Sequence, residues 1–512
     1  MSSADCYLIG IGGSGSKCID NYTYMCASGL GPKNLWMGIV DQDQPNGNVG
    51  KAKANIKSYQ NLYKKFRSEG QNNISPDVNL FKTHIRSQEN ELHWTPMDNV
   101  NVPTLKDLFK YDNLNDDLKD LMECLYHSKK DLELSLKEGF RGRPSIGTAA
   151  MIAKMQENVP FWQNIFDALD DVTQGKEIRI FLISSIFGGT GASGFPSIAR
   201  LIRSILKAKG ITENVYIGGS LLLPYFSFPK PEDSTDKEES AYADAFLQQS
   251  KGALDYYYRL FQREKIFDEL YLTGWDPLIQ LNYFDSGGTG QNNPPLLPEL
   301  YSCLSASTFF NKPKDSFEDE NYVYYTGRSS ELEFNWNDLP SVNSNTNEVK
   351  NLMGQLLRTS VSFRFDWLES LTTKWKQEQG TSWYTSLIQS KVDLNNTNTK
   401  DLILQLGDYF DNYLNWISSM ISHSKSNIND VINLVETNQF STFDNAIEKN
   451  GVVLTKKHQG SAKLDKLIMN SNSNSSEEIF EEMSESSKFK NQSGLGIFLN
   501  TLYHACRSKG GK

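Results

Sequence analysis

The amino-acid sequence predicts an α/β fold, a doubly wound parallel sheet followed by a mostly helical C-terminal region. Strand-like apolar runs alternate with helix-like stretches over more than half of the 512 residues, which is typical of a parallel sheet with helices on both faces. Glycine-rich loops follow several of these runs, as in folds that bind ligands at the carboxyl ends of their strands. We therefore expect residues 1–311 to form the sheet domain and residues 312–512 to form a mostly helical region with polar linkers.

The first strand is expected at residues 6–10, because a short apolar run there leads into a glycine-rich segment at 11–16. A helix-like stretch follows at 17–25, and a second apolar run at 35–40 ends at Asp41. Strand, loop, helix and strand in this order are the opening of a parallel α/β sheet.

The segment from about residue 50 to 138 is polar and contains no glycine loop, so we expect a long insertion or an elaborated helix pair there. A second glycine loop, at 139–147, opens a helix-like stretch. The next strand is predicted at 178–185, and it leads into the third glycine-rich run at 187–194, which opens another helix.

The alternation continues in the second half of the sheet domain. Strands are expected at 215–223 and 269–273, with a long helix between them at 238–263. A loop rich in glycine and asparagine, at 285–295, precedes a helix at about 297–310. Beyond it, polar spacers separate amphipathic helical stretches, of which the main ones lie at 349–375, 401–421 and 495–504.

The composition argues against several kinds of protein. A net charge of −10 does not suit a general nucleic-acid-binding surface, which needs clustered lysine and arginine. No window approaches the roughly 18 apolar residues of a membrane helix, and the first residues lack a signal-peptide pattern, so we expect a cytoplasmic protein without a membrane partner. The six cysteines and six histidines show no metal-ligand spacing, so we assign no metal site.

The first and third glycine loops suit phosphate groups. Phosphate needs many fixed donors and little steric bulk, which glycine backbone supplies. Each loop also opens a helix, whose N-terminus carries a partial positive charge of about +0.5. Thr190 adds a hydroxyl that can bond a terminal phosphate oxygen. The expected phosphate contacts are Gly12, Gly13, Ser14, Gly15 and Ser16 in the first loop and Gly188, Gly189, Thr190 and Gly191 in the third.

The first loop alone leaves a second interpretation open. Residues 10–15 contain the pattern G-x-G-x-x-G, and Asp41 ends the next strand, where an NAD-dependent oxidoreductase of the Rossmann fold has a ribose-binding acid. Such an enzyme would have no need of the two later glycine loops. A Walker A motif is absent, because Lys17 is preceded by Ser16 and followed by Cys18.

Four segments, in order along the first half of the chain, resemble the tubulin/FtsZ family of self-assembling GTPases. Residues 12–15 resemble its first phosphate loop, and residues 141–150 resemble the FtsZ loop of form G-A-x-P-E-x-G-x-x-A-A with several departures. Residues 187–194 resemble the family signature G-G-G-T-G-S-G, with Phe187 in place of its first glycine. Residues 223–228 resemble the FtsZ segment T-K-P-F-x-F.

The resemblance implies a tubulin/FtsZ-like nucleotide-binding domain over residues 1–311. It implies GTP or GDP as the bound cofactor, together with Mg²⁺, and self-association into filaments or oligomers. The C-terminal region is a candidate surface for a further protein partner. Apart from the phosphate contacts already given, the resemblance implies phosphate contacts at Gly142, Arg143 and Pro144, and a base contact at Asn293 or its neighbour Asn292. Asp41, at the end of the second strand, is a candidate contact for ribose or magnesium, and a solvated cap of the strand is the alternative for it.

The catalytic element of the family is not recognisable. In FtsZ and tubulin an acidic loop of one subunit, N-x-D-x-x-D in FtsZ, completes the active site of the next, and this chain lacks that motif. The nearest candidates are Glu299, as a catalytic acid, and the acidic cluster at 315–320. An acid in the first turn of a helix also stabilises the helix dipole, so a structural role for Glu299 stays open. Whether the protein hydrolyses GTP therefore stays open as well. The alternative function is a nucleotide-gated interaction module that forms no filament.

Overall fold

The computed structural model describes most of the chain. Arg141 and Gly142 of the second glycine loop, and residues 318–320 of the acidic cluster, lie outside the described residues. The described residues are 4–43, 45–97, 104–126, 129–136, 140, 143–155, 159–172, 175–227, 243–281, 293–317, 322–328, 338–342, 347–425, 473–485, 489 and 492–509.

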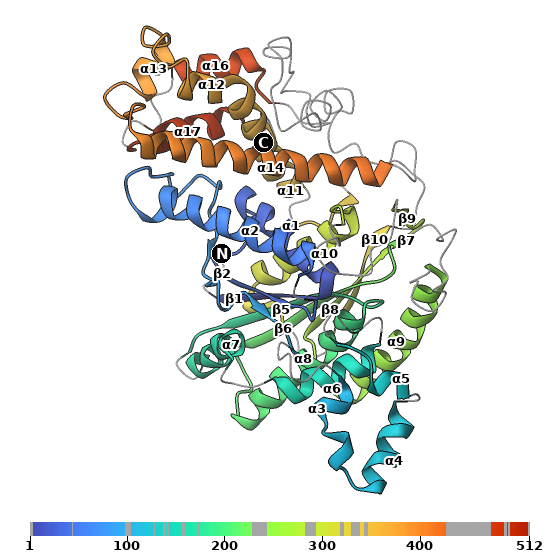
Figure 1. Cartoon of the computed structure of the whole chain (residues 1–512). Coiled ribbons are helices and arrows are strands. Elements are labelled where there is room, and N and C mark those ends of the chain that lie inside the picture. The colour runs from blue at the N-terminus through green and yellow to red at the C-terminus, as the bar shows by residue number, and fades with distance from the viewer. Residues whose placement is uncertain are drawn as a thin grey trace.

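A parallel sheet forms the centre of the structure (Figure 1). The strand order is β10-β8-β6-β5-β1-β2-β3, with β4 also paired to β2, and every pairing is parallel. Apolar runs form its inner strands, since a strand covered on both faces needs no polar side. The strands are β1 (Asp5–Ile11), β2 (Asn34–Val40), β3 (His84–Ile85), β4 (His93–Trp94), β5 (Ile178–Ser185), β6 (Val215–Leu222), β8 (Glu269–Trp275) and β10 (Tyr322–Arg328).

Helices cover both faces of this sheet, so the predicted doubly wound α/β fold is confirmed (Figure 1). One face carries α1 (Gly12–Ser28), α2 (Gly47–Tyr63) and α10 (Leu297–Asn311). The other face carries α7 (Pro160–Asp171) and α8 (Gly189–Ala208). Two further helices, α6 (Pro144–Lys154) and α9 (Ala243–Arg263), lie on the α8 side, and a small second sheet pairs β7 (Phe226–Ser227) with β9 (Ile279–Gln280).

The segment 50–138, expected to be an insertion, contributes to the main sheet. Its two-residue strands β3 and β4 both pair with β2. Strands this short show no alternation of polar and apolar residues, so the sequence pattern does not reveal them. The segment also contains most of α2, then the π-helical turn η1 (Lys64–Ser68), α3 (Leu105–Leu108), η2 (Tyr111–Asn113), α4 (Asp116–Leu125) and α5 (Lys129–Leu132).

The sheet also extends beyond residue 311, because β10 pairs in parallel with β8. This strand lies at the edge of the sheet and its residues are half-buried or exposed, which explains why no apolar run marks it. The region after β10 is mostly helical, as predicted. It contains α11 (Glu348–Ser362), η7 (Phe363–Trp367), α12 (Leu368–Thr372), α13 (Ser382–Leu387), α14 (Thr397–Lys425), α16 (Ser476–Glu485) and α17 (Leu495–Ala505).

The helix α17 folds back onto the first part of the chain. The Leu495 amide donates to Asn72 Oδ1 at 2.9 Å, and the Ser75 amide donates to Asn500 Oδ1 at 3.0 Å. Helices α17 and α14 therefore both pack on the α/β domain, and α14 lies across α1 and α2 (Figure 1).

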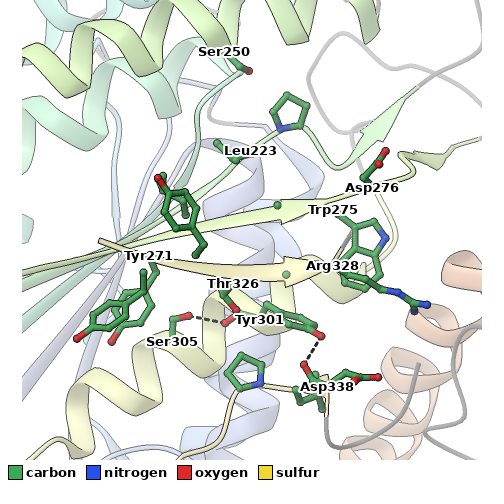
Figure 2. Close-up of a pocket in the computed structure, with 18 of the residues that line it drawn as sticks. Leu223, Ser250, Tyr271, Trp275, Asp276, Tyr301, Ser305, Thr326, Arg328 and Asp338 are labelled. Carbon is green, nitrogen blue, oxygen red and sulfur yellow. Dashed lines mark hydrogen bonds between the residues drawn. The ribbon is translucent and has the colours of Figure 1, made fainter. Parts of the chain in front are cut away.

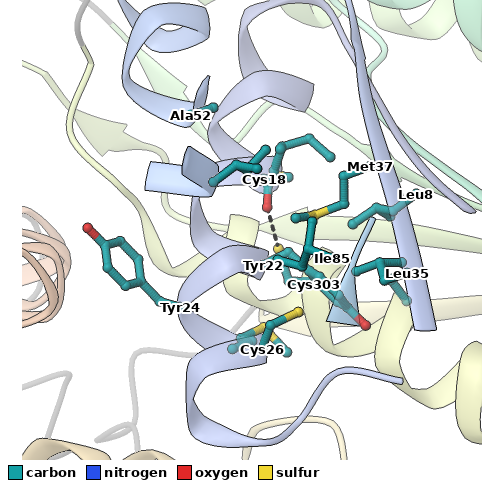
Figure 3. Packing of buried hydrophobic residues seen from close by; sticks show 14 of the residues in the cluster. Leu8, Cys18, Tyr22, Tyr24, Cys26, Leu35, Met37, Ala52, Ile85 and Cys303 are labelled. Carbon is teal, nitrogen blue, oxygen red and sulfur yellow. Dashed lines mark hydrogen bonds between the residues drawn. The ribbon is translucent and has the colours of Figure 1, made fainter. Parts of the chain in front are cut away.

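Helix α1 lies at the centre of the core, between the sheet and the surrounding helices (Figure 3). Its apolar side chains pack on β1, β2 and α10, and Cys303 of α10 donates from Sγ to the Cys18 carbonyl at 3.3 Å. Polar side chains of α1 are buried too, so they need partners inside the protein. Within the described ranges, no helix is long and apolar enough to cross a membrane and no cluster of three or more His, Cys, Asp or Glu side chains could hold a metal ion.

Candidate functional site

The first and third glycine loops meet at the carboxyl edge of the sheet. Strands β1 and β5 are neighbours, with Ile11 opposite Ser184, and each leads directly into a helix. Gly12 has a φ of +73°, and a Cβ atom built on it would lie 3.2 Å from the Gly191 amide nitrogen. The N-terminus of α1 therefore touches the N-terminus of α8, as two halves of one site would require.

Both helix N-termini present unobstructed amides. The first amide to bond within α8 is that of Ala192, which donates to the Gly188 carbonyl at 2.9 Å. The preceding amides, those of Gly189, Thr190 and Gly191, thus have no acceptor within the helix. Neither α1 nor α8 has an acidic residue in its first turn. The edge is therefore suited to an anion.

Some of the predicted phosphate contacts serve packing instead. A Cβ on Gly15 would lie 2.6 Å from the Gly10 carbonyl carbon and 2.8 Å from the Ile183 oxygen. A Cβ on Gly191 would lie 2.7 Å from the Ser185 oxygen. These two glycines let α1 and α8 sit directly on the strands. Ser16 is buried, and its hydroxyl donates to the Gly12 carbonyl at 3.0 Å inside its own helix.

The residues at the open side of the two loops are half-buried and face the edge. They are Gly13 and Ser14 at the start of α1 and Gly188 and Gly189 at the start of α8. A Cβ on Gly188 would meet only the Ser185 hydroxyl, at 3.3 Å. Thr190 is nearly buried, with 8% of its surface exposed.

Asp41 lies beside Thr190 and carries a strongly perturbed carboxyl group. Burial raises its pKa to about 7, and hydrogen bonds from the Asp43 backbone and the Thr190 side chain lower it only in part. Its Oδ2 atom is buried and has no hydrogen-bond partner within the described part of the chain. A buried carboxyl oxygen beside a phosphate loop fits a protonated acid that donates to phosphate, or a ligand of Mg²⁺.

Replacing Asp41 by asparagine should stabilise the nucleotide-free protein at about pH 8 by roughly 1 to 3 kcal/mol. The pKa in the folded protein lies above the ordinary value of 3.8, so the folded state holds this proton more tightly than the unfolded state. Stability from Asp41 is therefore complete below the ordinary pKa and is lost as the pH rises towards about 7. Urea unfolding at about pH 5 and about pH 8 measures the effect, and an equal difference at both values would contradict it.

In the described part of the second glycine loop, Arg143 forms an ion pair and Gly147 lies close to α8. Arg143 Nε lies 2.8 Å from Asp131 Oδ1, and 42% of the arginine side chain is exposed. Pro144 begins α6, and Gly147 lets this helix approach Ser193 of α8. The predicted phosphate contact of Arg143 would therefore require its guanidinium to leave Asp131.

Glu299 is enclosed in the core. Its side chain is fully buried and forms an ion pair with Lys17 of α1. Oε1 also accepts from the Tyr225 hydroxyl at 2.7 Å, and Oε2 accepts from Asn21 at 3.3 Å and from the Leu296 amide at 3.1 Å. This placement does not suit the catalytic role that the sequence suggested, because a catalytic acid must reach a substrate. It also makes Glu299 an N-terminal cap of α10.

Sequence reasoning missed the partners of Glu299, which are Lys17, Asn21 and Tyr225. One signal was present in the sequence. Lys17 directly follows the first glycine loop but belongs to no Walker motif, so its ammonium group needs a partner other than phosphate. Asn293, the predicted base contact, lies next to the start of α2, where its amide donates to Asn48 Oδ1 at 3.2 Å.

Asp315, the one acid of the 315–320 cluster among the described residues, lies at the opposite end of the strands from the glycine loops. Arg179, near the start of β5, donates to the carbonyls of Phe309, Phe310 and Lys312 at 2.9, 3.0 and 2.6 Å. The end of α10 is thus held where the strands begin. Asp315, in the exposed turn η5 (Lys314–Ser316), lies there as well.

A cavity of about 990 Å³ lies at the β10 edge, between α9 and α10 (Figure 2). Aromatic side chains form much of its wall, including Tyr271 and Trp275 of β8 and Tyr301 of α10. The Tyr301 hydroxyl donates to the Asp338 carbonyl at 2.6 Å. The lining contains none of the residues of the three glycine loops, so this cavity is separate from the candidate phosphate site.

Two helix N-termini that meet above neighbouring parallel strands define the class of protein, an α/β fold with loops suited to phosphate. Residues 7–246 match the family model described as "Tubulin like". The resemblance to the tubulin/FtsZ family is therefore confirmed, and this part of the chain is tubulin-like. No curated protein matches the chain.

Several solved structures are similar to the chain at low identity. The GDP-bound CetZ1 monomer from Haloferax volcanii is 13% identical, with 52% of this chain and 50% of that chain covered and a TM-score of 0.26. CetZ from Methanosaeta thermophila is 15% identical, with 53% and 45% covered and a TM-score of 0.21. A GTPγS-form protofilament of TubZ from Bacillus thuringiensis is 10% identical, with 60% and 55% covered and a TM-score of 0.21. The chain spans about half the length of these structures, so the family match carries the assignment.

Proposed function

We propose that this protein binds a guanine nucleotide and that the nucleotide state controls its self-association. The observation that carries the proposal is the contact between Gly12 and Gly191, which joins two helix N-termini beside the buried carboxyl of Asp41. GTP and GDP are favoured over other nucleotides by the tubulin-like family match and by the GDP in the CetZ1 structure.

In this proposal the phosphates lie against the open side of the two loops. Gly12, Gly13 and Ser14 approach them from α1, and Gly188, Gly189 and Thr190 approach them from α8. Bound Mg²⁺ would neutralise phosphate charge, and Asp41 is the residue that would hold it. Arg143 would add a positive charge to the same edge once it leaves Asp131.

Self-association would join the carboxyl ends of the strands in one copy to the amino ends of the strands in the next copy. The glycine loops lie at the carboxyl edge of the sheet, and Asp315 lies at the amino edge. An edge-to-edge contact of this kind is heterologous, so it can repeat and produce an open filament. It would bring the acidic segment of one copy to the nucleotide of the next, which is a geometry for assembly-dependent hydrolysis. We propose a cytoplasmic location for this assembly.

The first experiment is equilibrium binding of a fluorescent GTP analogue with Mg²⁺, competed separately by GTP, ATP and NAD. We expect displacement by GTP with at least about tenfold preference over ATP. Displacement by NAD alone would overturn the proposal. Light scattering and pelleting with GTP then test assembly, with Asp315→Ala as the variant expected to pellet less while binding GTP normally.

The second candidate function is a nucleotide-gated interaction module that forms no filament. The helical layer of α11 to α17 favours it, because this layer covers α1 and α2 and gives the protein a large second surface (Figure 1). GTP binding without any pelleting, together with a partner that copurifies only with nucleotide present, would favour this function over self-association.

A further inference from the structure

Helix α4 has an apolar face that is open to solvent. Leu118, Leu121 and Leu125 follow one another at helical spacing, so they share this face. Their exposed fractions are 44%, 52% and 61%. Met122, which lies beside them on the helix surface, is buried and anchors α4 on the rest of the protein. A continuous row of exposed apolar side chains, unlike a single one, is typical of an interaction surface.

Acidic side chains accompany the leucines of α4. The helix contains four acids and one lysine, so its net charge is −3. Within the described ranges, Asp117 and Asp120 form no ion pair that would neutralise them. A surface that covers α4 therefore has to be positively charged as well as apolar. The four acids, all of them exposed, are Asp116, Asp117, Asp120 and Glu123.

Helix α9 has the complementary chemistry. Leu247 and Tyr258 are 52% and 66% exposed and lie three turns apart on one side of this helix. Lys251 lies between them on the same side, and Arg263 is exposed near the end of the helix. Neither cation forms an ion pair with another described residue. Figure 1 shows α4 and α9 on the side of the sheet that carries α8, so one chain presents both surfaces.

We propose that α4 of one copy packs against α9 of a second copy. The leucines of α4 would cover Leu247 and Tyr258, and the acids of α4 would face Lys251 and Arg263. Apolar side chains are then buried at the centre and charges remain at the rim, as in other protein interfaces. This contact goes beyond the proposed function, because it joins helices, not the ends of the strands, and requires no nucleotide.

The contact should be weak and should depend on salt. Two faces of a few side chains each bury less than the roughly 1,200–2,000 Å² of a stable interface. We therefore expect the full-length, nucleotide-free protein to associate with a dissociation constant of about 10 to 100 µM. Sedimentation velocity from about 1 to 200 µM protein measures it, and about 0.5 M salt should weaken it several-fold, because the charges at the rim are screened.

A charge exchange tests which helices meet. Asp117→Lys with Asp120→Lys reverses the charge of α4, and Lys251→Glu with Arg263→Glu reverses it on α9. Each double variant should associate at least about tenfold more weakly, since like charges then face each other. The variant that carries all four changes should associate as the wild type does. All four side chains are exposed, so the fold tolerates the exchange, and a fourfold variant as weak as the double variants would overturn the proposal.

Leu121→Glu tests the apolar part of the contact, and Leu404→Glu is the matched control. Leu404 lies in α14 and is 49% exposed, close to the value for Leu121. Only Leu121→Glu should remain monomeric. Cys124 gives a local readout, because it is the one exposed cysteine of the six and lies in α4. Its reaction with a maleimide should slow at high protein concentration in the wild type and in Leu404→Glu, but not in Leu121→Glu.

The outcomes separate this proposal from the proposed function. A wild type that stays monomeric to about 200 µM without nucleotide overturns it, whether or not GTP binds. The occupant of α4 would then be a basic segment of another protein. Association that survives Leu121→Glu, or that Leu404→Glu abolishes equally, overturns it too. A wild type that associates through α4 but binds no GTP overturns the proposed function alone.

Discussion

Replacing Glu299 by alanine should lower the free energy of unfolding by about 3 to 5 kcal/mol. The side chain is fully buried, and its removal leaves the Lys17 ammonium without its counter-charge in the core. Tyr225 and Asn21 lose an acceptor at the same time. Each unsatisfied buried donor adds a cost of about 1 to 3 kcal/mol before the structure relaxes. Urea unfolding, followed by circular dichroism, measures the difference.

The double variant that carries both Lys17→Met and Glu299→Leu provides the decisive control. Removing both charges should recover at least about 1 kcal/mol relative to Glu299→Ala, because no buried charge then lacks a partner. The exposed pair of Arg200 and Glu264, with atoms 2.7 Å apart, provides the surface comparison, and Glu264→Ala should cost at most about 1 kcal/mol. A stable Glu299→Ala protein that has lost only GTP hydrolysis would instead restore the catalytic role for Glu299.

Replacing Gly189 by valine should weaken binding of a triphosphate nucleotide by about 100-fold while the protein stays folded. Gly189 is the first residue of α8 and lies half-buried on the open side of the third loop. Its branched replacement would occupy the space where phosphate approaches the backbone. Thr190→Ala should have a smaller effect, about tenfold, since it removes one hydrogen bond to phosphate. Competition with the fluorescent GTP analogue measures both.

The matched control is Gly252→Val. Gly252 lies in α9, is exposed, and has no atom within 4 Å of the position that a Cβ would take. It should bind nucleotide as the wild type does. Thermal unfolding checks that Gly189→Val is folded, and an unchanged affinity in that folded variant would contradict the site. Gly15→Val and Gly191→Val are unsuitable tests, because their side chains would clash with strand backbone and unfold the protein.

Much of the fold could be predicted from the sequence, because the inner strands are apolar runs, two of which, β1 and β5, lead directly into glycine loops. Strands β1, β2, β5, β6 and β8 all lie where such runs were found. The edge strands were missed for a physical reason. β3 and β4 have two residues each, and β10 has a tyrosine-rich, half-exposed surface, so none shows the pattern of a buried strand.

The candidate site could be predicted only in part. Sequence pattern identified the two loops, and the structure brings them together at Gly12 and Gly191. The sequence pattern could not distinguish glycines that leave space for a ligand from glycines that let a helix pack closely on a strand, because both are simply glycine in the sequence. Nor could it reveal the role of Glu299, since its partner Lys17 is 282 positions away and only the folded chain brings the two together.

The contacts of α17 have a consequence for the synthesis of the protein. The Asn500 side chain bonds the Ser75 amide, and the Asn72 side chain bonds the Leu495 amide, so the surface near residues 70–75 is finished by a helix made more than 400 residues later. Contacts across such sequence distances form late and slow a folding reaction. On the ribosome, the tubulin-like half must therefore wait with this surface uncovered until α17 has emerged.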